Sequence, residues 1–174
     1  MLLPYLKEFI HRNPHISISI ECQSTNETLK LLDDDKIDIG LIGKPASLKT
    51  FNFYYLDNIE DIFVTTKDYL RNLSARGVKK SEILQNSTLM LLDKGNMTRK
   101  YIDDYLQENQ IHVKDSIDIS NMDLLIDFAK IGVGVACVIK SIVSKELADG
   151  TLIEIPLGIP IHKREVGFAY KESS

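Results

Sequence analysis

Histidines and clustered acids are the side chains of this 174-residue chain that could support metal chemistry. The histidines show neither a His-X-His nor an HEXXH spacing, so surface or loop positions explain them better than a metal does. Asp33, Asp34 and Asp35 are adjacent, but they lack the alternating oxygen ligands and closing glutamate of a calcium loop. A solvated turn is favoured there, and no metal site is predicted. The histidines are His11, His15, His112 and His162.

The sequence also lacks the usual catalytic motifs. There is no Gly-X-Ser-X-Gly elbow and no Cys/His pair that would activate a nucleophile. Asp103 and Asp104 are neighbours, but with Lys100 nearby they fit a solvent-facing helix surface better than an acid–base dyad. The Gly-Val-Gly run at 132–134 lacks the third glycine of a dinucleotide fingerprint and precedes a predicted strand. We therefore expect no enzyme activity and no cofactor.

The cysteines and the charge balance indicate the environment of the chain. Cys22 and Cys137 are far apart and form no CXXC motif, which favours reduced, buried thiols. The net charge of −4 comes without the basic stripe that DNA backbones require, so this chain alone is not expected to bind DNA. No apolar run approaches the roughly 20 residues of a membrane span, and no export leader precedes Leu2. We expect a cytoplasmic protein that does not contact a membrane.

Three predicted helix N-termini offer a different chemistry, the binding of a small anionic or polar ligand. Unpaired N–H groups at a helix start carry partial positive charge and suit a carboxylate or phosphate. In an open α/β sheet, such starts gather beyond the carboxyl ends of the strands. Lys44, after Gly43, and Arg99 could add charge. For each residue taken singly, an ordinary cap or a solvated cation is the alternative. The three segments are Gln23, Ser24 and Thr25; Asn96, Met97 and Thr98; and Ser120, Asn121 and Met122.

Helices and strands alternate along the chain, which predicts the α/β fold that would bring these segments together. The first elements are a helix at 2–12, a period-two strand at 16–20, a helix at 24–32 and a strand at 37–42. The next are β-rich segments at 51–56 and 59–66, short helices at 68–73 and 81–84, a strand at 88–92 and a helix at 97–108.

The segment 117–152 has the most informative pattern. Ser120 followed by Asp123 resembles a capping box, and Gly132 can end the helix in a left-handed turn. The apolar run at 133–138 then predicts a strand that is covered on both faces. A short helix follows, and Gly-Thr-Leu at 150–152 starts another strand.

This order of elements resembles the effector-binding domain of LysR-type transcriptional regulators. The Gly-hydrophobic-Gly turn and the Gly-X-Leu strand start resemble its C-terminal half. The segment LLPYLKEFIHRNPHISISIE is similar to its first helix and following strand, and KLLDDDKIDIGLI to the helix, acidic turn and strand that come next. The resemblance covers nearly all of the chain in the right order.

The resemblance implies a two-lobed type 2 periplasmic-binding-protein-like fold, in which each lobe is a small, mostly parallel sheet flanked by helices. Lobe I is expected at about 1–65 plus 139–174 and lobe II at about 66–138, with crossings near Thr65 and Val138. The implied function is to sense a small-molecule effector between the lobes. The candidate effector-binding residues are Gln23, Ser24, Thr25, Gly43, Lys44, Asn96, Met97, Thr98, Asn121 and Met122.

The resemblance also implies partners. Such domains pair side by side, which predicts a homodimer here and a homotetramer for a full-length regulator. Leu3, Leu6, Phe9 and Ile10 could serve that pairing or belong to the core. DNA is expected to be bound only through an N-terminal winged helix-turn-helix absent from this chain. The first strand of the family's domain is also expected to precede Met1.

Two other classes of protein stay open from the sequence. A free-standing solute-binding protein of the same fold would feed a transporter, and an export leader or lipid-attachment cysteine would favour it. An enzyme on this fold, similar to a prephenate dehydratase, would need a polar catalytic cluster.

Overall fold

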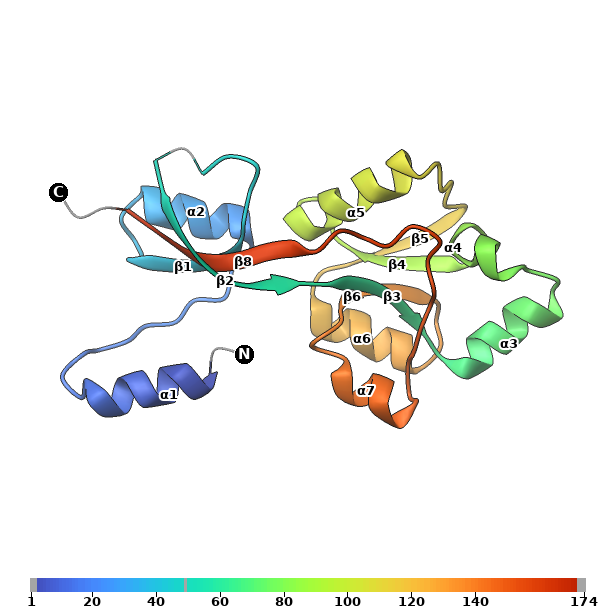
Figure 1. The fold of residues 1–174 in the computed structure, drawn as a ribbon, viewed down its shortest axis with the longest axis horizontal. Helices are drawn as coiled ribbons and strands as arrows, with labels where there is room; N and C mark the ends of the chain where they lie inside the picture. Colours follow the sequence, from blue (N-terminus) through green and yellow to red (C-terminus); the bar gives the residue numbers. More distant parts are fainter. Residues whose placement is uncertain (1–2, 49, 172–174) are drawn as a thin grey trace.

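The computed structural model describes residues 3–48 and 50–171, and it folds into two lobes with one sheet each (Figure 1). The first sheet has three strands in the order β1-β8-β2, and the second has five in the order β5-β4-β6-β3-β7. Helices pack on both sheets, so the predicted two-lobed α/β architecture is confirmed. None of the helices in the described part of the chain is long and apolar enough to cross a membrane.

Lobe I contains α1 (Leu3–Arg12), α2 (Thr25–Asp33), β1 (Ile39–Gly43), β2 (Asn52–Ile59) and β8 (Arg164–Tyr170). Both strand pairs are antiparallel, with β8 in the middle. The expectation of a mostly parallel sheet is therefore wrong for this lobe. The reason is topological: β8 brings the chain back from lobe II, so it runs against the two strands beside it.

The strand expected at 16–20 is not formed. Ile16, Ile18 and Ile20 lie in an extended, non-helical segment and are 51%, 37% and 70% exposed. Period-two alternation predicts one apolar face, but a strand also needs a neighbour to bond its backbone, and no described strand pairs with this segment. Figure 1 shows α1 set apart from the sheet at the end of this segment.

Helix α1 is not a core helix. Its apolar residues Phe9 and Ile10 are both 46% exposed, so the core alternative for them is not supported. Leu2, at the expected start of the helix, and the side chain of Leu3 lie outside the described residues.

Lobe II is built on a mixed sheet of five strands. The parallel pairs are β4 with β5 and with β6, while β3 is antiparallel to β6 and β7. The strands are β3 (Asp61–Thr65), β4 (Thr88–Leu92), β5 (Asp115–Ile119), β6 (Val135–Ile139) and β7 (Ile153–Glu154). The helices are α3 (Lys67–Ala75), η1 (Lys80–Glu82), α4 (Ile83–Asn86), α5 (Met97–Glu108), α6 (Met122–Lys130) and α7 (Ser144–Asp149).

Both faces of this sheet are covered, as the apolar runs predict. Leu89 and Leu91 of β4 pack with Ile102 of α5 in one core. Met90 of β4 packs with Leu125 of α6 in the other, on the opposite face of the sheet. Helices α5 and α6 are therefore held firmly on the two sides of β4.

The chain crosses between the lobes at Glu60 and between 155 and 164, which differs from the crossings expected near Thr65 and Val138. Strand β3 pairs with β6 and β7, so residues 61–65 and 153–154 belong to the sheet of lobe II. Residues 52–65 form two nearly continuous strands with no turn between them. The sequence could not show at which residue this long extended segment changes sheets.

Cys137 is buried, but Cys22 is exposed in the extended segment before α2, so the expectation of two buried thiols is wrong for Cys22.

Gly132 has φ +76°, which confirms the left-handed end of α6. Gly134 runs so close to β4 that an added Cβ would lie 2.3 Å from the carbonyl oxygen of Thr88.

Candidate functional site

The starts of α5 and α6 lie side by side at one edge of the lobe II sheet. Each helix follows one of two adjacent parallel strands, in which Leu92 of β4 is aligned with Ile119 of β5. The N–H of Asp93 donates to the carbonyl oxygen of Ile119 at 3.1 Å and joins the two strand ends. In Figure 1 this edge faces lobe I.

The start of α2 faces the other way, toward lobe II. Strand β1 runs from Ile39, paired with Tyr170, to Gly43, paired with Val166 near the crossing. Helix α2 precedes β1 and lies along it in the opposite direction, with Thr28 and Leu32 over Gly40. Its N-terminus is thus the end nearer to lobe II (Figure 1).

The predicted cap of α2 is present. Ser24 Oγ accepts from the N–H of Glu27 at 3.3 Å, and the Thr28 hydroxyl donates to the Ser24 carbonyl at 2.9 Å. Ser24 and Thr25 are half-buried, whereas Gln23 is exposed. A side-chain cap satisfies one of the four N–H groups that a helix start leaves unpaired, so the others can still bind a ligand.

Helices α5 and α6 are each capped by an asparagine. Asn96 Oδ1 accepts from the N–H of Thr98 at 2.8 Å, and Asn121 Oδ1 accepts from the N–H of Leu124 at 2.9 Å. The capping box expected from Ser120 is therefore wrong by one residue. Since Asn is as good a cap as Ser, the sequence alone could not choose between the adjacent candidates.

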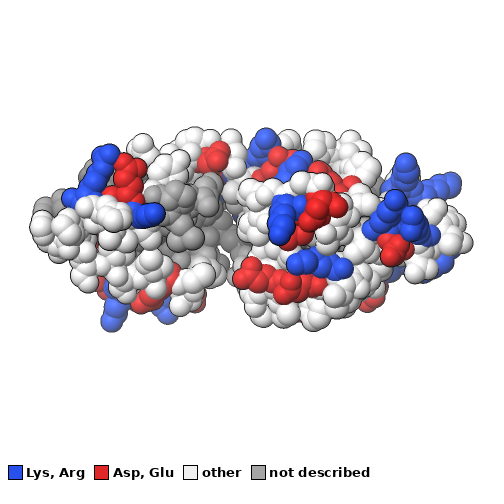
Figure 2. All heavy atoms as spheres, turned by 90° about the horizontal axis from the view of Figure 1, so that it is seen from below, with Lys and Arg blue, Asp and Glu red and all other residues white. Residues whose placement is uncertain are grey.

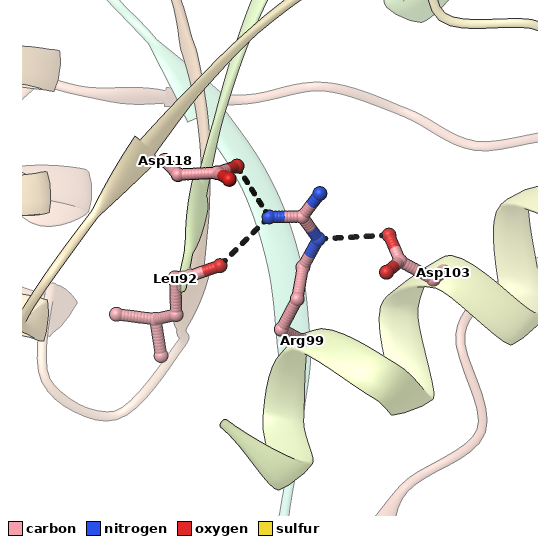
Figure 3. A network of polar contacts seen from close by, with 4 residues as sticks. All are labelled: Leu92, Arg99, Asp103 and Asp118. Carbon is pink, nitrogen blue, oxygen red and sulfur yellow. Dashed lines mark hydrogen bonds and ion pairs between the residues drawn. The ribbon is translucent and has the colours of Figure 1, made fainter. Parts of the chain in front are cut away.

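Arg99 is buried beneath the start of α5 and is fully engaged with protein partners (Figure 3). Its Nε donates to Asp103 at 2.8 Å, and its Nη1 donates to Asp118 at 2.5 Å and to the Leu92 carbonyl at 2.9 Å. Its side chain is only 6% exposed, whereas those of Asp103 and Asp118 are 46% and 40% exposed. Arg99 thus joins α5 to the ends of β4 and β5.

Two opposing effects act on the pKa of Arg99. Burial by itself lowers it, but the hydrogen bonds with Asp103 and then Asp118 outweigh burial, so the pKa stands above its ordinary value. One cation beside two carboxylates leaves this edge of lobe II with a net negative charge from the three groups. Arg99 therefore positions the helix starts instead of supplying a free positive charge.

Lys44 is also paired. Its Nζ lies 2.6 Å from Glu165 Oε2 and 5.6 Å from the centroid of the Phe53 ring. It follows Gly43 at the end of β1, near the crossing into β8. On the face shown in Figure 2, basic and acidic side chains occur in small interspersed groups.

The structure therefore sorts the ten candidate residues into three places. Residues 23–25 lie at the start of α2, residues 43–44 at the end of β1, and residues 96–98 and 121–122 side by side at the starts of α5 and α6. A depression of about 160 Å³ lies elsewhere, at the crossing, and its lining includes Glu60, Asp61 and Pro160. None of the ten candidates lines it.

An ion pair at the crossing was not predicted. Arg164 Nε and Nη2 donate to the two oxygens of Asp61 at 2.7 and 2.9 Å. The two residues are 103 positions apart in the chain. No local pattern in the sequence could have paired them.

Two sheets joined by crossing strands, with helices packed on each, define the class of two-lobed, periplasmic-binding-protein-like domains. The family model described as LysR substrate binding domain matches residues 1–174, and the chain belongs to this family.

Curated relatives of the chain are transcriptional regulators. It is 22% identical over 156 residues to the HTH-type transcriptional regulator YeiE of Escherichia coli K12, covering 89% of this chain and 52% of YeiE. It is 24% identical over 164 residues to the HTH-type transcriptional activator CmpR of Synechocystis, covering 91% of this chain and 52% of CmpR. The chain thus spans about half the length of these relatives. They favour the regulatory interpretation over the solute-binding one.

Solved structures of similar fold are regulatory domains. One is the Synechocystis CcmR regulatory domain in complex with 2-PG, with a TM-score of 0.82, 16% identity, and coverage of 99% of this chain and 83% of that one. Another is the effector-binding domain of QuiR in complex with shikimate, with a TM-score of 0.80, 15% identity, and coverage of 100% and 82%. At such identities the likeness concerns the fold.

Proposed function

We propose that this chain is the effector-sensing domain of a LysR-type transcriptional regulator and binds one small metabolite between its lobes. The observation that carries this proposal is the facing arrangement of capped helix starts, α2 from lobe I and α5 with α6 from lobe II (Figure 1). Complexes of CcmR with 2-PG and of QuiR with shikimate support a small polar ligand.

The ligand would be recognised mainly by backbone N–H groups and small polar side chains. Lys44 and Arg99 both have carboxylate partners, so neither offers an unpaired positive charge to a ligand. A carboxylate or phosphate on the ligand would instead accept from the free N–H groups in the first turns of the helices. Hydroxyl groups of the ligand could donate to the half-exposed carboxylate of Asp118.

Binding would act on transcription through the arrangement of the lobes. A ligand that contacts both lobes stabilises the arrangement it fits, by its difference in affinity for the two states. We propose that this change reaches DNA through an N-terminal DNA-binding region of the full-length protein, in a homodimer or homotetramer in the cytoplasm. The exposed residues Phe9 and Ile10 of α1 are candidates for the pairing surface. No catalytic step is part of this function.

A thermal-shift screen of amino acids, organic acids and sugar phosphates tests the proposal. A ligand at a hundred times its Kd should stabilise the folded chain by about 2.7 kcal/mol. Thr25→Val should weaken binding of a hit, and Thr151→Val, at an exposed position near β7, is the matched control. Equal affinity in both variants would contradict a site at the start of α2, and turnover of a compound would contradict the class.

A further inference from the structure

The two crossings between the lobes meet at a buried ion pair. Asp61 is the first residue of β3 in the lobe II sheet, and Arg164 is the first residue of β8 in the lobe I sheet. The Asp61 side chain is 0% exposed and that of Arg164 is 12% exposed. Both guanidinium–carboxylate contacts, at 2.7 and 2.9 Å, are short and form a bidentate pair.

The ion pair lies where any change of the angle between the lobes must bend the chain. Arg164 is aligned with Ile59, the last residue of β2, so the two crossing segments are side by side. Glu60 lies between β2 and β3, and its carbonyl accepts from the N–H of Lys140 at 2.9 Å. The first crossing is therefore held to the end of β6 as well.

Helix α5 holds the second crossing. Tyr101 donates its hydroxyl to the His162 carbonyl at 2.7 Å, and its ring centroid lies 5.5 Å from the guanidinium carbon of Arg164. Tyr105, one turn further, donates to the Ile159 carbonyl at 2.6 Å. The helix that begins at the proposed site is thus bonded to the segment that leads into lobe I.

We propose that Asp61 and Arg164, with Tyr101 beside the guanidinium, are positioning residues that fix the angle between the lobes and so the separation of the helix starts of α2 and α5. The consequence of these contacts for effector binding rests on the proposed function. The contacts among Asp61, Arg164 and Tyr101, which we call the lock, are a property of the ligand-free protein. Such a lock favours one discrete lobe arrangement, because a buried Asp61 that lost its partner would be left desolvated and unpaired.

The experiment measures the distance between the lobes without any ligand. Fluorophores are attached at Lys30→Cys on α2 and Ser74→Cys on α3, both exposed positions, in a Cys22→Ser background. Single-molecule energy transfer is compared between the parent, Arg164→Lys and Arg164→Gln. Lysine keeps the charge but loses the bidentate geometry, so it should have the smaller effect.

Two further variants make the test specific. Glu165→Gln breaks the exposed pair with Lys44 at the next position of β8 and is the matched control. Tyr101→Phe removes one hydroxyl and leaves the Asp61–Arg164 ion pair intact. If either Arg164 variant does not fold, this variant still tests the contact between α5 and the second crossing. Circular dichroism and urea unfolding establish that each variant is folded.

We expect the distance distribution to shift or broaden in the order Arg164→Gln, Arg164→Lys, Tyr101→Phe, and to stay unchanged in Glu165→Gln. An unchanged distribution in every folded variant of Arg164 and Tyr101 would overturn the lock, as would an equal change in the Glu165 control. The outcome does not depend on a ligand. If no metabolite binds in the thermal-shift screen while the Arg164 and Tyr101 variants alter the distance distribution, the proposed function is rejected and the lock is retained.

Discussion

Arg99 Nη1 donates to the carbonyl oxygen of Leu92 at 2.9 Å, so the first turn of α5 is bonded to the last residue of β4. The same nitrogen reaches Asp118 on β5. One buried side chain thus fixes a helix start against two strand ends, at the edge where the proposed ligand would bind.

We expect Arg99→Met to lower the free energy of unfolding by about 2–3 kcal/mol, because the Leu92 carbonyl and two carboxylates lose a charged donor. The loss of stability stays moderate because Asp103 and Asp118 are nearly half exposed and can be hydrated. Urea unfolding measures the effect. Arg71→Met breaks the exposed pair with Asp68 and should cost at most about 0.5 kcal/mol, so equal losses would argue against this role of Arg99.

The turn between α6 and β6 is predicted to tolerate no side chain at Gly134. A Cβ there would lie 2.3 Å from a backbone oxygen of β4, which cannot move without disturbing the sheet. We expect Gly134→Ala to cost about 2–3 kcal/mol. Gly132→Ala should cost about 1 kcal/mol, chiefly from its left-handed backbone, with a smaller addition from a Cβ that would lie 3.2 Å from the Thr66 hydroxyl oxygen.

Gly158→Ala is the control for both glycines, because a Cβ there meets no atom within 4 Å. Chemical denaturation of the three variants should rank them 134, 132, 158 from the largest loss to the smallest. A Gly134→Ala variant as stable as Gly158→Ala would show that the close approach to β4 is relieved at no cost.

The two cysteines should differ in reactivity. Cys22 is exposed and Cys137 is 5% exposed inside the core. A thiol reagent such as Ellman's should titrate one thiol per native chain rapidly and the second only in denaturant. Rapid reaction of both thiols in native buffer would contradict the core position of Cys137, and Cys22→Ser should abolish the fast phase.

Stability should fall as the solution becomes alkaline. Burial raises the pKa of Cys137 well above its ordinary value, so the folded chain keeps a proton that the unfolded chain releases. The stabilisation from the protonated Cys137 thiol is complete below the thiol pKa of the unfolded chain and is lost as the pH rises toward the thiol pKa of the folded chain. Above about pH 8.5 the free energy of unfolding should fall by up to about 1.4 kcal/mol per pH unit.

Urea unfolding at steps between about pH 7.5 and 9.5 measures this slope. Cys137→Ala lowers overall stability by leaving a cavity, but its slope with pH should be flatter than that of the parent. Parallel curves for the two chains would refute the assignment of the slope to Cys137.

Local patterns predicted much of lobe II. The spacing of apolar residues placed α5 at 97–108, where the structure has it, and the near-continuous apolar run at 133–138 identified β6 as covered on both faces. These predictions worked because each element buries a face whose period is visible in the sequence. The Ser24 cap succeeded for a similar reason, since its bonds join residues three and four apart.

Predictions that depended on distant partners fared worse. The segment at 16–20 has the alternation of a strand but has no neighbour to pair with, and the crossing at Glu60 depends on which sheet each half of a long extended segment joins. The ion pairs of Arg99 with Asp118 and of Arg164 with Asp61 arise only from the tertiary fold. Lys44 and Arg99, which from the sequence could add positive charge to the site, are each paired with carboxylates in the structure.

The central claim, that one metabolite bridges helix starts from both lobes, is tested most directly by amide NMR during titration with a hit from the thermal-shift screen. We predict saturable shifts, with one common Kd, at the amides of Thr25 on α2, Met97 on α5 and Met122 on α6. Shifts confined to one lobe, or centred on residues far from all three helix starts, would contradict it.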